Sequence, residues 1–587
     1  MTNTSRPDRS LHPSLGPALL TPGPGPFIPV PPQLSDAMEL SARTLWVTLA
    51  AVAGVWFLTL GARHLLPSDE GRYAEIAREM FATGDWVTIR YNGLKYFEKP
   101  PFALWMTALS YHAFGVGEWQ ARLWAAISGA LGLAMTMWAT RRWFGARVAI
   151  LAGLVLLAAP LWNIGSHFNS LDIGVSGALA CVLAGMLVAQ HPQATPSSRR
   201  NAMWIAWGAM AVAVLTKGLI GIVLPGLVLV LYTLLARDWS VWRRLHAVSG
   251  ALLLLALTAP WFVLVSLRNP EFAQFFFIHE HWQRYTSGVH QRSAPLWYFV
   301  PLLVAGFAPW IGLSARMAAT AHDDEREISF KPRLLLVAWA ATIFMFFSAS
   351  GSKLPGYILP IFPALAMLAA LALDRLDSKA WNRQIWGALA VASAGLLASP
   401  WVGRLGSDST PNELYRAFVP WFAAACAIAI AGFALARRLN REGRILRSKL
   451  VFGLAVFSAT TVGLLGHDTL GRNSSGIDLV APMRAALTPG MPVYGVRLLD
   501  HTLPFYLQRS ITLVEAPDEL EFGTRQEPHK WLPTLAAFED EWSSGRPALA
   551  IMSRDTFALL RSRNVIMYAV AESPRRVVVA SFPKAAP

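Results

Sequence analysis

The sequence predicts an all-α, multi-pass membrane domain followed by a small C-terminal α/β domain. Three observations support this fold class. The chain of 587 residues is 54% hydrophobic and only 15% charged, whereas an ordinary soluble domain is about 25% charged. Long apolar runs recur along most of the chain, and hydropathy falls only towards the C-terminus. Polar residues are too few to cover soluble domains in a chain of this length, which excludes a soluble enzyme, a fibre and a disordered protein.

The N-terminal segment, residues 1–40, is rich in Pro, Gly and Ser and is expected to be disordered. It lacks the pattern of a cleaved signal peptide, in which a charged stretch precedes a short apolar run and a cleavage site of small residues. The first apolar run, Thr44 to Gly61, is therefore expected to act as an uncleaved signal anchor.

Residues 41–466 are predicted to form the membrane domain. Its apolar runs have lengths close to the roughly 20 residues that an α-helix needs to cross a bilayer. The thirteen predicted spans are 44–61, 122–140, 147–165, 171–190, 202–216, 218–236, 247–267, 295–318, 333–350, 356–374, 382–403, 415–436 and 449–466.

The charges between these runs predict their orientation. The short apolar run from Pro101 to Val116 would reverse every later span if it crossed the membrane itself. If it does not cross and the N-terminus is cytoplasmic, the inner loops hold most of the Lys and Arg residues, most densely from Arg437 to Lys449. The short outer loops then hold single cations: Lys217, Lys353 and Arg404. This distribution follows the positive-inside rule and predicts that Pro101–Val116 is a helix along the outer membrane surface.

The same distribution explains the net charge of +15. A basic chain can indicate nucleic-acid binding, but here most of the excess lies in predicted cytoplasmic loops. The sequence therefore predicts contact with membrane lipids and no nucleic-acid partner.

The last segment, residues 467–587, is predicted to be a small α/β domain on the outer side. Short β-like runs cover 493–496, 511–514, 548–552 and 577–581. Helix-like segments at 500–508 and 554–563 lie between them.

The first outer loop, residues 62–121, is the longest and the richest in polar residues. Ser68 or Asp69 can cap a helix that runs to about Ala82, and Gly84 can end it. On this evidence alone, Asp69 is as well explained as an N-cap as it is by a role in chemistry.

Two patterns in the loop favour chemistry. Asp69, Arg72 and Tyr73 are spaced i, i+3 and i+4, which puts them on one helical face. Further on, the segment from Lys95 to Pro101 concentrates two cations, a carboxylate and two aromatic rings. Interfacial anchoring by aromatic residues and lysine contact with lipid head groups are the alternatives, but both predict dispersed rather than concentrated charges.

Other predicted outer loops add candidates. Asp172 begins a span, where a helix N-terminus favours an anion, but an ionisable residue at a membrane boundary is also a functional candidate. Lys217 and Lys353 lie at outer turns, the second followed closely by Tyr357.

The loop from Phe277 to Arg292 holds three histidines together with Glu280 and Arg284. His279 and His281 are two residues apart and cannot share a helix face, and their spacing is not a zinc signature. A metal completed by a distant carboxylate such as Glu98 stays open. Cations of this kind suit phosphate binding, and carboxylates suit sugar hydroxyls or a positive charge that develops on a glycosyl carbon. The residues thus predict a membrane-interface enzyme for a phosphate-linked, lipid-borne substrate.

Several motifs in the sequence resemble those of a known protein family. They are S-D-E-G-R-Y-A-E-I-A-R-E-M, T-G-D-W-V-T and Y-N-G-L-K-Y-F-E-K-P-P in the first outer loop, followed by L-D-I-G, L-T-K-G and G-S-K-L-P-G-Y-I-L-P. With these motifs the sequence resembles the bacterial 4-amino-4-deoxy-L-arabinose lipid A transferases, members of the GT-C glycosyltransferase superfamily that are related to protein O-mannosyltransferases. The likeness covers residues 40–470 and, more loosely, the C-terminal domain. The sequence departs by its Pro-rich N-terminal extension and by Gly71, where Ala is commoner; neither belongs to the charged set.

The resemblance implies transfer of the aminopentose from undecaprenyl phosphate to lipid A phosphate at the periplasmic face of the inner membrane. This reaction would change the charge of lipopolysaccharide and give resistance to polymyxin and cationic antimicrobial peptides. The implied residues are Asp69 as the essential carboxylate, Asp172 as the second aspartate, Lys99 and Arg284 as phosphate contacts, Tyr73 and Tyr96 as cavity lining, Lys217, Lys353 and Tyr357 as contacts near the lipid phosphate, and Glu98 and His279 as ligands of a divalent ion such as zinc.

Two alternatives remain at this stage. A related enzyme could transfer a lipid-linked sugar to protein Ser or Thr hydroxyls, with Asp69 as general base. A lipid transporter would also have many spans, but transporters tend to carry their ionisable sites near the midplane in paired halves. Here the charges gather at one interface, which disfavours a transporter.

Overall fold

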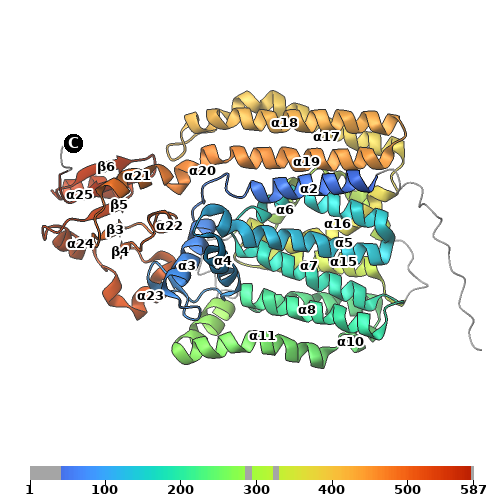
Figure 1. Ribbon diagram of the computed structural model, residues 1–587, viewed down its shortest axis with the longest axis horizontal. Coiled ribbons are helices and arrows are strands. Elements are labelled where there is room, and N and C mark those ends of the chain that lie inside the picture. The colour runs from blue at the N-terminus through green and yellow to red at the C-terminus, as the bar shows by residue number, and fades with distance from the viewer. Residues whose placement is uncertain (1–40, 284–293, 322–328, 584–587) are drawn as a thin grey trace, which may run out of the picture.

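The computed structural model describes residues 41–283, 294–321 and 329–583. Long helices lie side by side in a bundle, and the C-terminal domain lies against one end of it (Figure 1). The first-loop helices α3 (Asp69–Thr83) and α4 (Phe102–Phe114) lie between the bundle and this domain (Figure 1). The mostly helical membrane domain and the small C-terminal sheet domain match the predicted fold class.

The bundle helices follow the chain in order. Those of the first part are α2 (Ala42–Leu58), α5 (Glu118–Leu157), α6 (Pro160–Ser166), α7 (Leu171–Gln190), α8 (Pro196–Lys217), α9 (Ile220–Ala236), α10 (Ser240–Arg243) and α11 (Ala247–Arg268). Those of the second part are η1 (Gln274–Gln283), α13 (Phe299–Gly306), η2 (Trp310–Leu313), α14 (Ser314–Ala321), α15 (Pro332–Ala349), η3 (Pro355–Ile361), α16 (Phe362–Asp374), α17 (Ser378–Val402), α18 (Asn412–Arg441) and α19 (Ile445–Gly466).

The helices agree with most predicted spans, but the count of thirteen stays a prediction. Among the described residues, eight helices are long and apolar enough to cross a membrane, or nine if one bent pair is counted as a single span. The bent pair replaces the predicted span 295–318: its two parts meet at 99°, beside Pro309, which lacks a backbone donor.

The predicted span 147–165 is divided in the structure. Its first part continues α5, which is kinked at Gly145 (φ 86°, ψ 172°). Its last part is the separate helix α6, because Pro160 cannot continue the helix that precedes it.

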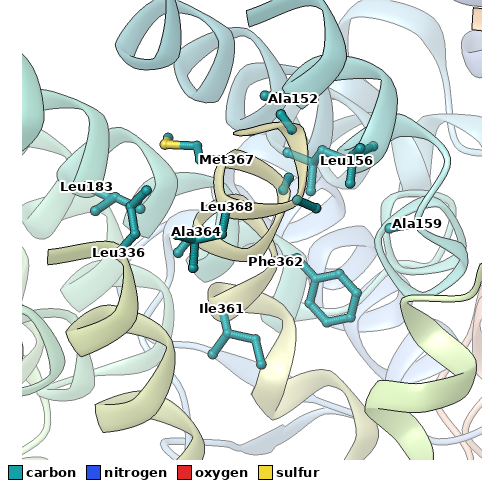
Figure 2. Close-up of a cluster of buried hydrophobic side chains, with 14 of the residues drawn as sticks. Ala152, Leu156, Ala159, Leu183, Leu336, Ile361, Phe362, Ala364, Met367 and Leu368 are labelled. Carbon is teal, nitrogen blue, oxygen red and sulfur yellow. The ribbon is translucent and has the colours of Figure 1, made fainter. Parts of the chain in front are cut away.

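The core of the membrane domain consists of apolar side chains from helices far apart in the sequence. Figure 2 shows Leu156 of α5, Leu183 of α7 and Leu336 of α15 around Phe362 and Met367 of α16, all buried. Helix α7 is buried over its whole length. Helices α17, α18 and α19 pack mainly on one another along one side of the bundle (Figure 1).

The first loop follows its predicted local structure. Helix α3 ends at Gly84, which has the left-handed conformation (φ 71°) that glycine adopts at low cost. A hairpin of β1 (Arg90–Tyr91) and β2 (Leu94–Lys95) follows, turning at Asn92 and Gly93 with positive φ angles of 54° and 78°. Helix α4 occupies the segment predicted as a surface helix and packs against α3 and α5.

The C-terminal domain contains a five-stranded sheet in the order β4-β3-β5-β7-β6. The strands are β3 (Val493–Val496), β4 (Thr512–Val514), β5 (Leu549–Met552), β6 (Tyr568–Glu572) and β7 (Val577–Ala580). Strand β3 is parallel to β4 and β5, and the last two strands are antiparallel to their neighbours. The helices are α20 (Asp468–Ser475), α21 (Ile477–Ala486), α22 (Leu503–Leu507), η4 (Asp518–Leu520), α23 (Glu521–Gln526), η5 (Pro528–Lys530), α24 (Leu535–Trp542) and α25 (Arg554–Ser562).

The four predicted strands match β3, β4, β5 and β7, whereas β6 was not predicted. Strand β6 is an edge strand that pairs only with β7, and three of its five residues are exposed. Its sequence, YAVAE, is mostly apolar, but two of its residues are alanines, which are depleted in strands and weaken the local signal.

Candidate functional site

The centre of the candidate site is the guanidinium of Arg72 on α3. Its Nη2 lies 3.2 Å from Asp69 Oδ1, one helical turn earlier. Its Nη1 lies 2.6 Å from Glu519 Oε2 of the C-terminal domain and donates to Tyr96 Oη at 3.3 Å. The predicted helical face of Asp69, Arg72 and Tyr73 is therefore present, with the Arg72 guanidinium 5.4 Å from the centre of the Tyr73 ring.

The segment predicted to concentrate charge continues this cluster. The Tyr96 hydroxyl donates to Glu98 Oε2 at 3.3 Å. Lys99 Nζ lies 3.8 Å from the same oxygen and donates to the Glu98 carbonyl at 3.0 Å. Burial raises the pKa of Tyr73 and Tyr96 well above the ordinary value, so both phenols stay protonated.

Glu519 also belongs to the site, although it was not among the residues predicted from the sequence. It lies on η4, after the end of β4, and His501 follows the end of the adjacent parallel strand β3. Parallel strands point their carboxyl ends towards the same edge of a sheet, where ligands of α/β domains commonly bind. The sheet therefore presents both residues at one edge, which faces α3.

Two buried polar atoms of this cluster are left without partners. Among the described residues, neither Arg72 Nε nor Glu519 Oε1 has a hydrogen-bond partner. A buried unsatisfied donor or acceptor costs about 1–3 kcal/mol, so unpaired atoms of both kinds on the two residues of one ion pair indicate a place for a polar ligand. Burial also raises the pKa of Glu519 to about 7, although Arg72 acts in the opposite direction.

The next residue along α3, Glu70, anchors the helix instead. Glu70 and Arg122 of α5 are both fully buried, and Arg122 Nε lies 2.6 Å from Glu70 Oε1. The remaining guanidinium hydrogens go to Glu70 Oε2 and to three backbone carbonyls. Glu70 also accepts from the backbone N–H groups of Leu66 and Asn169. This ion pair ties the start of α3 to the bundle.

The reading of Asp69 as an N-cap is not supported by the local geometry. Ser68 is the N-cap residue, and its side chain makes no capping hydrogen bond. Its φ of 65° is unusual for a residue other than glycine. Asp69 is the first helical residue, and its carboxylate is bound by Arg72.

A second charged cluster joins Asp172, Lys217 and Tyr357. Lys217 Nζ donates to Asp172 Oδ1 and lies 4.2 Å from the centre of the Tyr357 ring. A Cβ at Gly356 would be 2.3 Å from Asp172 Oδ2, so only glycine permits this close approach. Asp69 interacts electrostatically with Lys217, which links the two clusters.

The other predicted residues are placed less directly. Lys353 is buried, and its ammonium donates to the carbonyls of Ala294 (3.0 Å) and Ser350 (2.6 Å) rather than to a group of either cluster. Arg284 lies outside the described residues, as does the side chain of His279. Within the described ranges, no three His, Cys, Asp or Glu side chains are arranged to hold a metal ion. The metal site at Glu98 and His279 stays a prediction, because the His279 side chain is not among those described.

A large apolar cavity of about 1730 Å³ reaches the first loop. It runs between the α17–α19 layer and helices α6, α13 and α14. Its wall is mostly apolar, with Arg316 of α14 and Arg383 and Gln384 of α17 among the polar exceptions. Arg63 and His467 also line it, beside Leu66, which lies three residues before α3. Such a cavity suits the hydrocarbon chain of a lipid whose polar head lies near α3.

Comparison with known proteins agrees with both parts of the chain. Residues 98–264 match the family model of dolichyl-phosphate-mannose-protein mannosyltransferases, and residues 479–581 match the C-terminal domain of aminoarabinose transferases. The relative from Aeromonas salmonicida, named undecaprenyl phosphate-alpha-4-amino-4-deoxy-L-arabinose arabinosyl transferase, is 36% identical over 58% of this chain. This match spans 64% of that relative's length. A Pectobacterium carotovorum protein of the same name is 32% identical over 64% of this chain and 70% of its own length.

Solved structures extend the likeness over nearly the whole chain. The crystal structure of ArnT from Cupriavidus metallidurans in the apo state is 52% identical, covers 92% of this chain and 99% of its own, and superposes with a TM-score of 0.88. The structure of the same protein bound to undecaprenyl phosphate covers 93% of this chain and all of its own, with a TM-score of 0.89. These matches and the apolar helices identify a multi-pass membrane protein of the GT-C superfamily. The chain belongs to the ArnT family.

Proposed function

We propose that this chain is a glycosyltransferase that moves 4-amino-4-deoxy-L-arabinose from undecaprenyl phosphate to a phosphate of lipid A. The observation that carries the proposal is the incomplete charged cluster of Asp69, Arg72 and Glu519 beside a large apolar cavity. The names of the relatives and the undecaprenyl phosphate bound to the Cupriavidus protein support the choice of donor.

The cluster suits an aminopentose. The amino group of the sugar is a cation at neutral pH, and the unpaired Glu519 Oε1 is a buried acceptor suited to it. The unpaired Arg72 Nε is a donor suited to a sugar oxygen. Binding of the sugar would thus satisfy both atoms at once.

Transfer exchanges one carbon–oxygen bond for another. An oxygen of the lipid A phosphate bonds to the anomeric carbon while the bond from that carbon to the donor phosphate breaks. The bonding electron pair leaves with undecaprenyl phosphate. The acceptor phosphate is largely ionised, because its second pKa is about 6, so no strong base is needed.

Three side chains would act on this step directly, and a fourth would hold one of them in place. Lys99 and Lys217 would stabilise the negative charge that develops on the leaving phosphate, as cation clamps do in phosphoryl transfer. Asp69 would stabilise the positive oxocarbenium character of the sugar. Asp172 would hold the Lys217 ammonium in place through their ion pair.

The hydrocarbon chains of the lipid substrates need an apolar site that reaches the charged cluster at α3. The cavity between α13 and the α17–α19 layer has that character, and its Arg63 and His467 lie at the first-loop end. We therefore assign the hydrocarbon part of a lipid substrate to this cavity.

Several finer predictions belong to the same proposal. Arg284 as a second phosphate contact, a divalent ion at Glu98 and His279, and contacts of Lys353 and Tyr357 with the lipid phosphate are carried over from the sequence. So are the inner-membrane location, a cytoplasmic N-terminus and a periplasmic site. Adding a cationic sugar lowers the negative charge of lipid A, which accounts for the expected resistance to polymyxin and cationic peptides.

The test is mass spectrometry of lipid A from cells that make the donor but lack their own transferase. Wild-type protein is expected to add one aminopentose, and Asp69→Asn to add almost none. Asp408→Asn is a matched control, because Asp408 is exposed on a loop distant in sequence from α3, and it should behave as wild type. Wild-type transfer by Asp69→Asn would contradict the role of Asp69, and an unmodified lipid A profile with wild-type protein would contradict the acceptor.

A labelled donor distinguishes transfer to lipid A from transfer to protein. After incubation with membranes, label is expected in the lipid fraction. Label in the protein fraction, on Ser or Thr, would instead support an O-mannosyltransferase-like reaction, for which the match of residues 98–264 is the supporting observation.

A further inference from the structure

His501 lies beside the unpaired oxygen of Glu519 without bonding to it. Its Nδ1 is 3.5 Å from Glu519 Oε1, which is too long for a hydrogen bond. The same Nδ1 is 2.8 Å from the hydroxyl oxygen of Tyr91 in the first-loop hairpin. Glu519 Oε2, in contrast, is bound by Arg72 at 2.6 Å.

The direction of the bond between Tyr91 and His501 follows from burial. Tyr91 is fully buried, and burial raises its pKa well above the ordinary value, so the phenol keeps its proton. Within the described part of the chain, that hydroxyl makes no hydrogen bond other than the one to His501. We assign the phenol as donor and Nδ1 as acceptor, because the hydroxyl has no other acceptor in the described part of the chain; in a neutral imidazole the ring proton is then on Nε2.

The loop around His501 is held on several sides. The imidazole and the Tyr91 ring are stacked, with centres 6.2 Å apart and planes 11° apart. The His501 carbonyl packs against Gly71, where an added Cβ would be 2.3 Å away. Asp500 is bound by Arg576 Nε at 2.6 Å and accepts from the backbone N–H of Leu503.

The two loops also carry backbone strain of the kind found at functional sites. Arg497, Glu515 and Asp518 have φ angles of 51°, 62° and 46°. Non-glycine residues with such angles persist only where the surroundings stabilise them, and they cluster at ligand sites. Arg497 and Glu515 stabilise each other through an ion pair of 2.6 Å that joins the two loops.

We infer that Tyr91 is a positioning residue: by making His501 Nδ1 an acceptor, it keeps Glu519 Oε1 open for the ammonium of the donor sugar. While Nδ1 accepts from Tyr91, it has no proton to give to Glu519. Without Tyr91, a proton on Nδ1 would bind the carboxylate and occupy the oxygen that the sugar needs. The inference rests on the proposed role of Glu519 and deepens it, because it assigns the selection of an amino sugar over a neutral one to a pair of residues from two domains.

The experiment compares two donors in the full-length, detergent-purified enzyme: undecaprenyl phosphate carrying the amino sugar, and the same lipid carrying L-arabinose, whose hydroxyl replaces the amino group. The quantity measured is the ratio of kcat/KM between the two. Loss of one charge-assisted hydrogen bond corresponds to about a tenfold change. Glu519→Gln is expected to lower the ratio by at least that much.

The decisive variant is Tyr91→Phe. We expect it to raise KM for the amino donor about tenfold with kcat nearly unchanged, and to leave the hydroxyl donor unaffected. Combined with Glu519→Gln, it should add no further loss, because both changes remove the same interaction. Tyr494→Phe is the matched control: its hydroxyl also bonds an acceptor, Glu541, in the C-terminal domain, and the ratio should not change.

A second variant guards against a folding defect. His501→Phe keeps a ring to stack on Tyr91 but removes both nitrogens, so no ring proton can occupy Glu519 Oε1. Added to Tyr91→Phe, it should therefore restore the ratio to near the wild-type value. A merely structural role would reduce both donors equally and leave the ratio unchanged. If Glu519→Gln lowers the ratio while Tyr91→Phe leaves it as in wild type, or if His501→Phe does not restore the ratio of Tyr91→Phe, the inference is overturned and the role of Glu519 stands. If Glu519→Gln itself changes nothing, the proposed contact with the amino group is wrong.

Discussion

Two neighbouring carboxylates at the start of α3 have opposite surroundings. Glu70 is fully buried, and its partner Arg122 uses every guanidinium hydrogen on the bundle side of the helix. Asp69 shares Arg72 with Glu519, and this cluster leaves one donor and one acceptor unpaired. A complete network indicates a structural anchor, whereas an incomplete one in the same helix indicates a site that a ligand completes.

The two networks should therefore respond differently to mutation. Breaking a buried ion pair on one side leaves an uncompensated charge and costs about 3–5 kcal/mol. Changing an incomplete, partly strained cluster costs less stability and more function, because natural sites trade stability for binding.

The largest effect is expected at the anchor. Arg122→Met should lower the free energy of unfolding by about 3–5 kcal/mol, because it leaves the Glu70 carboxylate buried without a cation. Thermal unfolding in detergent measures the loss. Arg438→Met is the control: its ion pair with Glu442 is largely exposed, so the change should stay within about 0.5 kcal/mol. Equal stability of both variants would show that the Glu70 network is not an anchor.

The next effect tests the boundary between the two networks, at Gly71. Gly71→Ala would place a methyl group 2.3 Å from the His501 carbonyl oxygen, and overpacking of this kind costs about 1–3 kcal/mol. The melting temperature should fall and the KM for the donor should rise, because the loop that carries His501 must move. Gly54→Ala is the control: nothing lies within 4 Å of the new methyl group, so the melting temperature and the KM should not change in this way. Ala is commoner at position 71 in the family that the sequence resembles. If Gly71→Ala behaved as wild type, the loop that carries His501 would be able to shift at little cost, which would contradict this prediction.

The third effect sharpens the comparison through pH. Glu519 has a pKa of about 7, raised by burial, and only its ionised form can accept from the ammonium of the sugar. Below about pH 7 the free enzyme holds a proton there that must leave on binding, so donor KM should rise by up to tenfold per pH unit. Above pH 7 the KM should be constant. A pH series of initial rates measures this, and Glu519→Gln should show a high KM without the acid rise. If the increase in donor KM below pH 7 persisted in Glu519→Gln, a group other than Glu519 would be responsible for it.

The smallest effect concerns Ser68, which precedes both carboxylates. Its φ of 65° costs a residue with a side chain about 1–3 kcal/mol, whereas glycine adopts it freely but loses more backbone entropy on folding. Ser68→Gly should raise the stability by up to about 1 kcal/mol. Ser170→Gly is the control, since Ser170 is also an N-cap without a capping bond but has an ordinary φ of −133°; it should lower the stability slightly. A loss in both variants would indicate that the Ser68 backbone is unstrained.

Local patterns in the sequence predicted one side of the site and not the other. The spacing of Asp69, Arg72 and Tyr73 and the stop at Gly84 depend on helix geometry within a few residues, and α3 follows both. The strands of the C-terminal sheet were also predicted, apart from the exposed edge strand β6. Glu519 was missed because it lies on a short turn of a distant domain, and only the parallel pairing of β3 with β4 brings it to Arg72.

Buried partners were equally hard to predict. Arg122 stands at the start of an apolar run, where the sequence gives no sign that it satisfies Glu70. Lys353 shows the same limit: the sequence places it at a predicted outer turn but gives no sign that its ammonium is bound to two backbone carbonyls. Whether a charged side chain is available to a ligand depends on tertiary hydrogen bonds, which leave no periodic pattern.

The pairing of the first loop with the last domain has a consequence for biosynthesis. The hairpin residue Asn92 exchanges two hydrogen bonds with the backbone of Ile511, and Arg90 is bound by Glu527 at 2.9 Å. The ribosome makes the loop early and these partners last. Until the final strands fold, Arg72 has no Glu519, so a nascent or truncated chain inserts its helices without a finished site. An interrupted chain is therefore expected to lack the completed charged cluster and, with it, the proposed transfer activity.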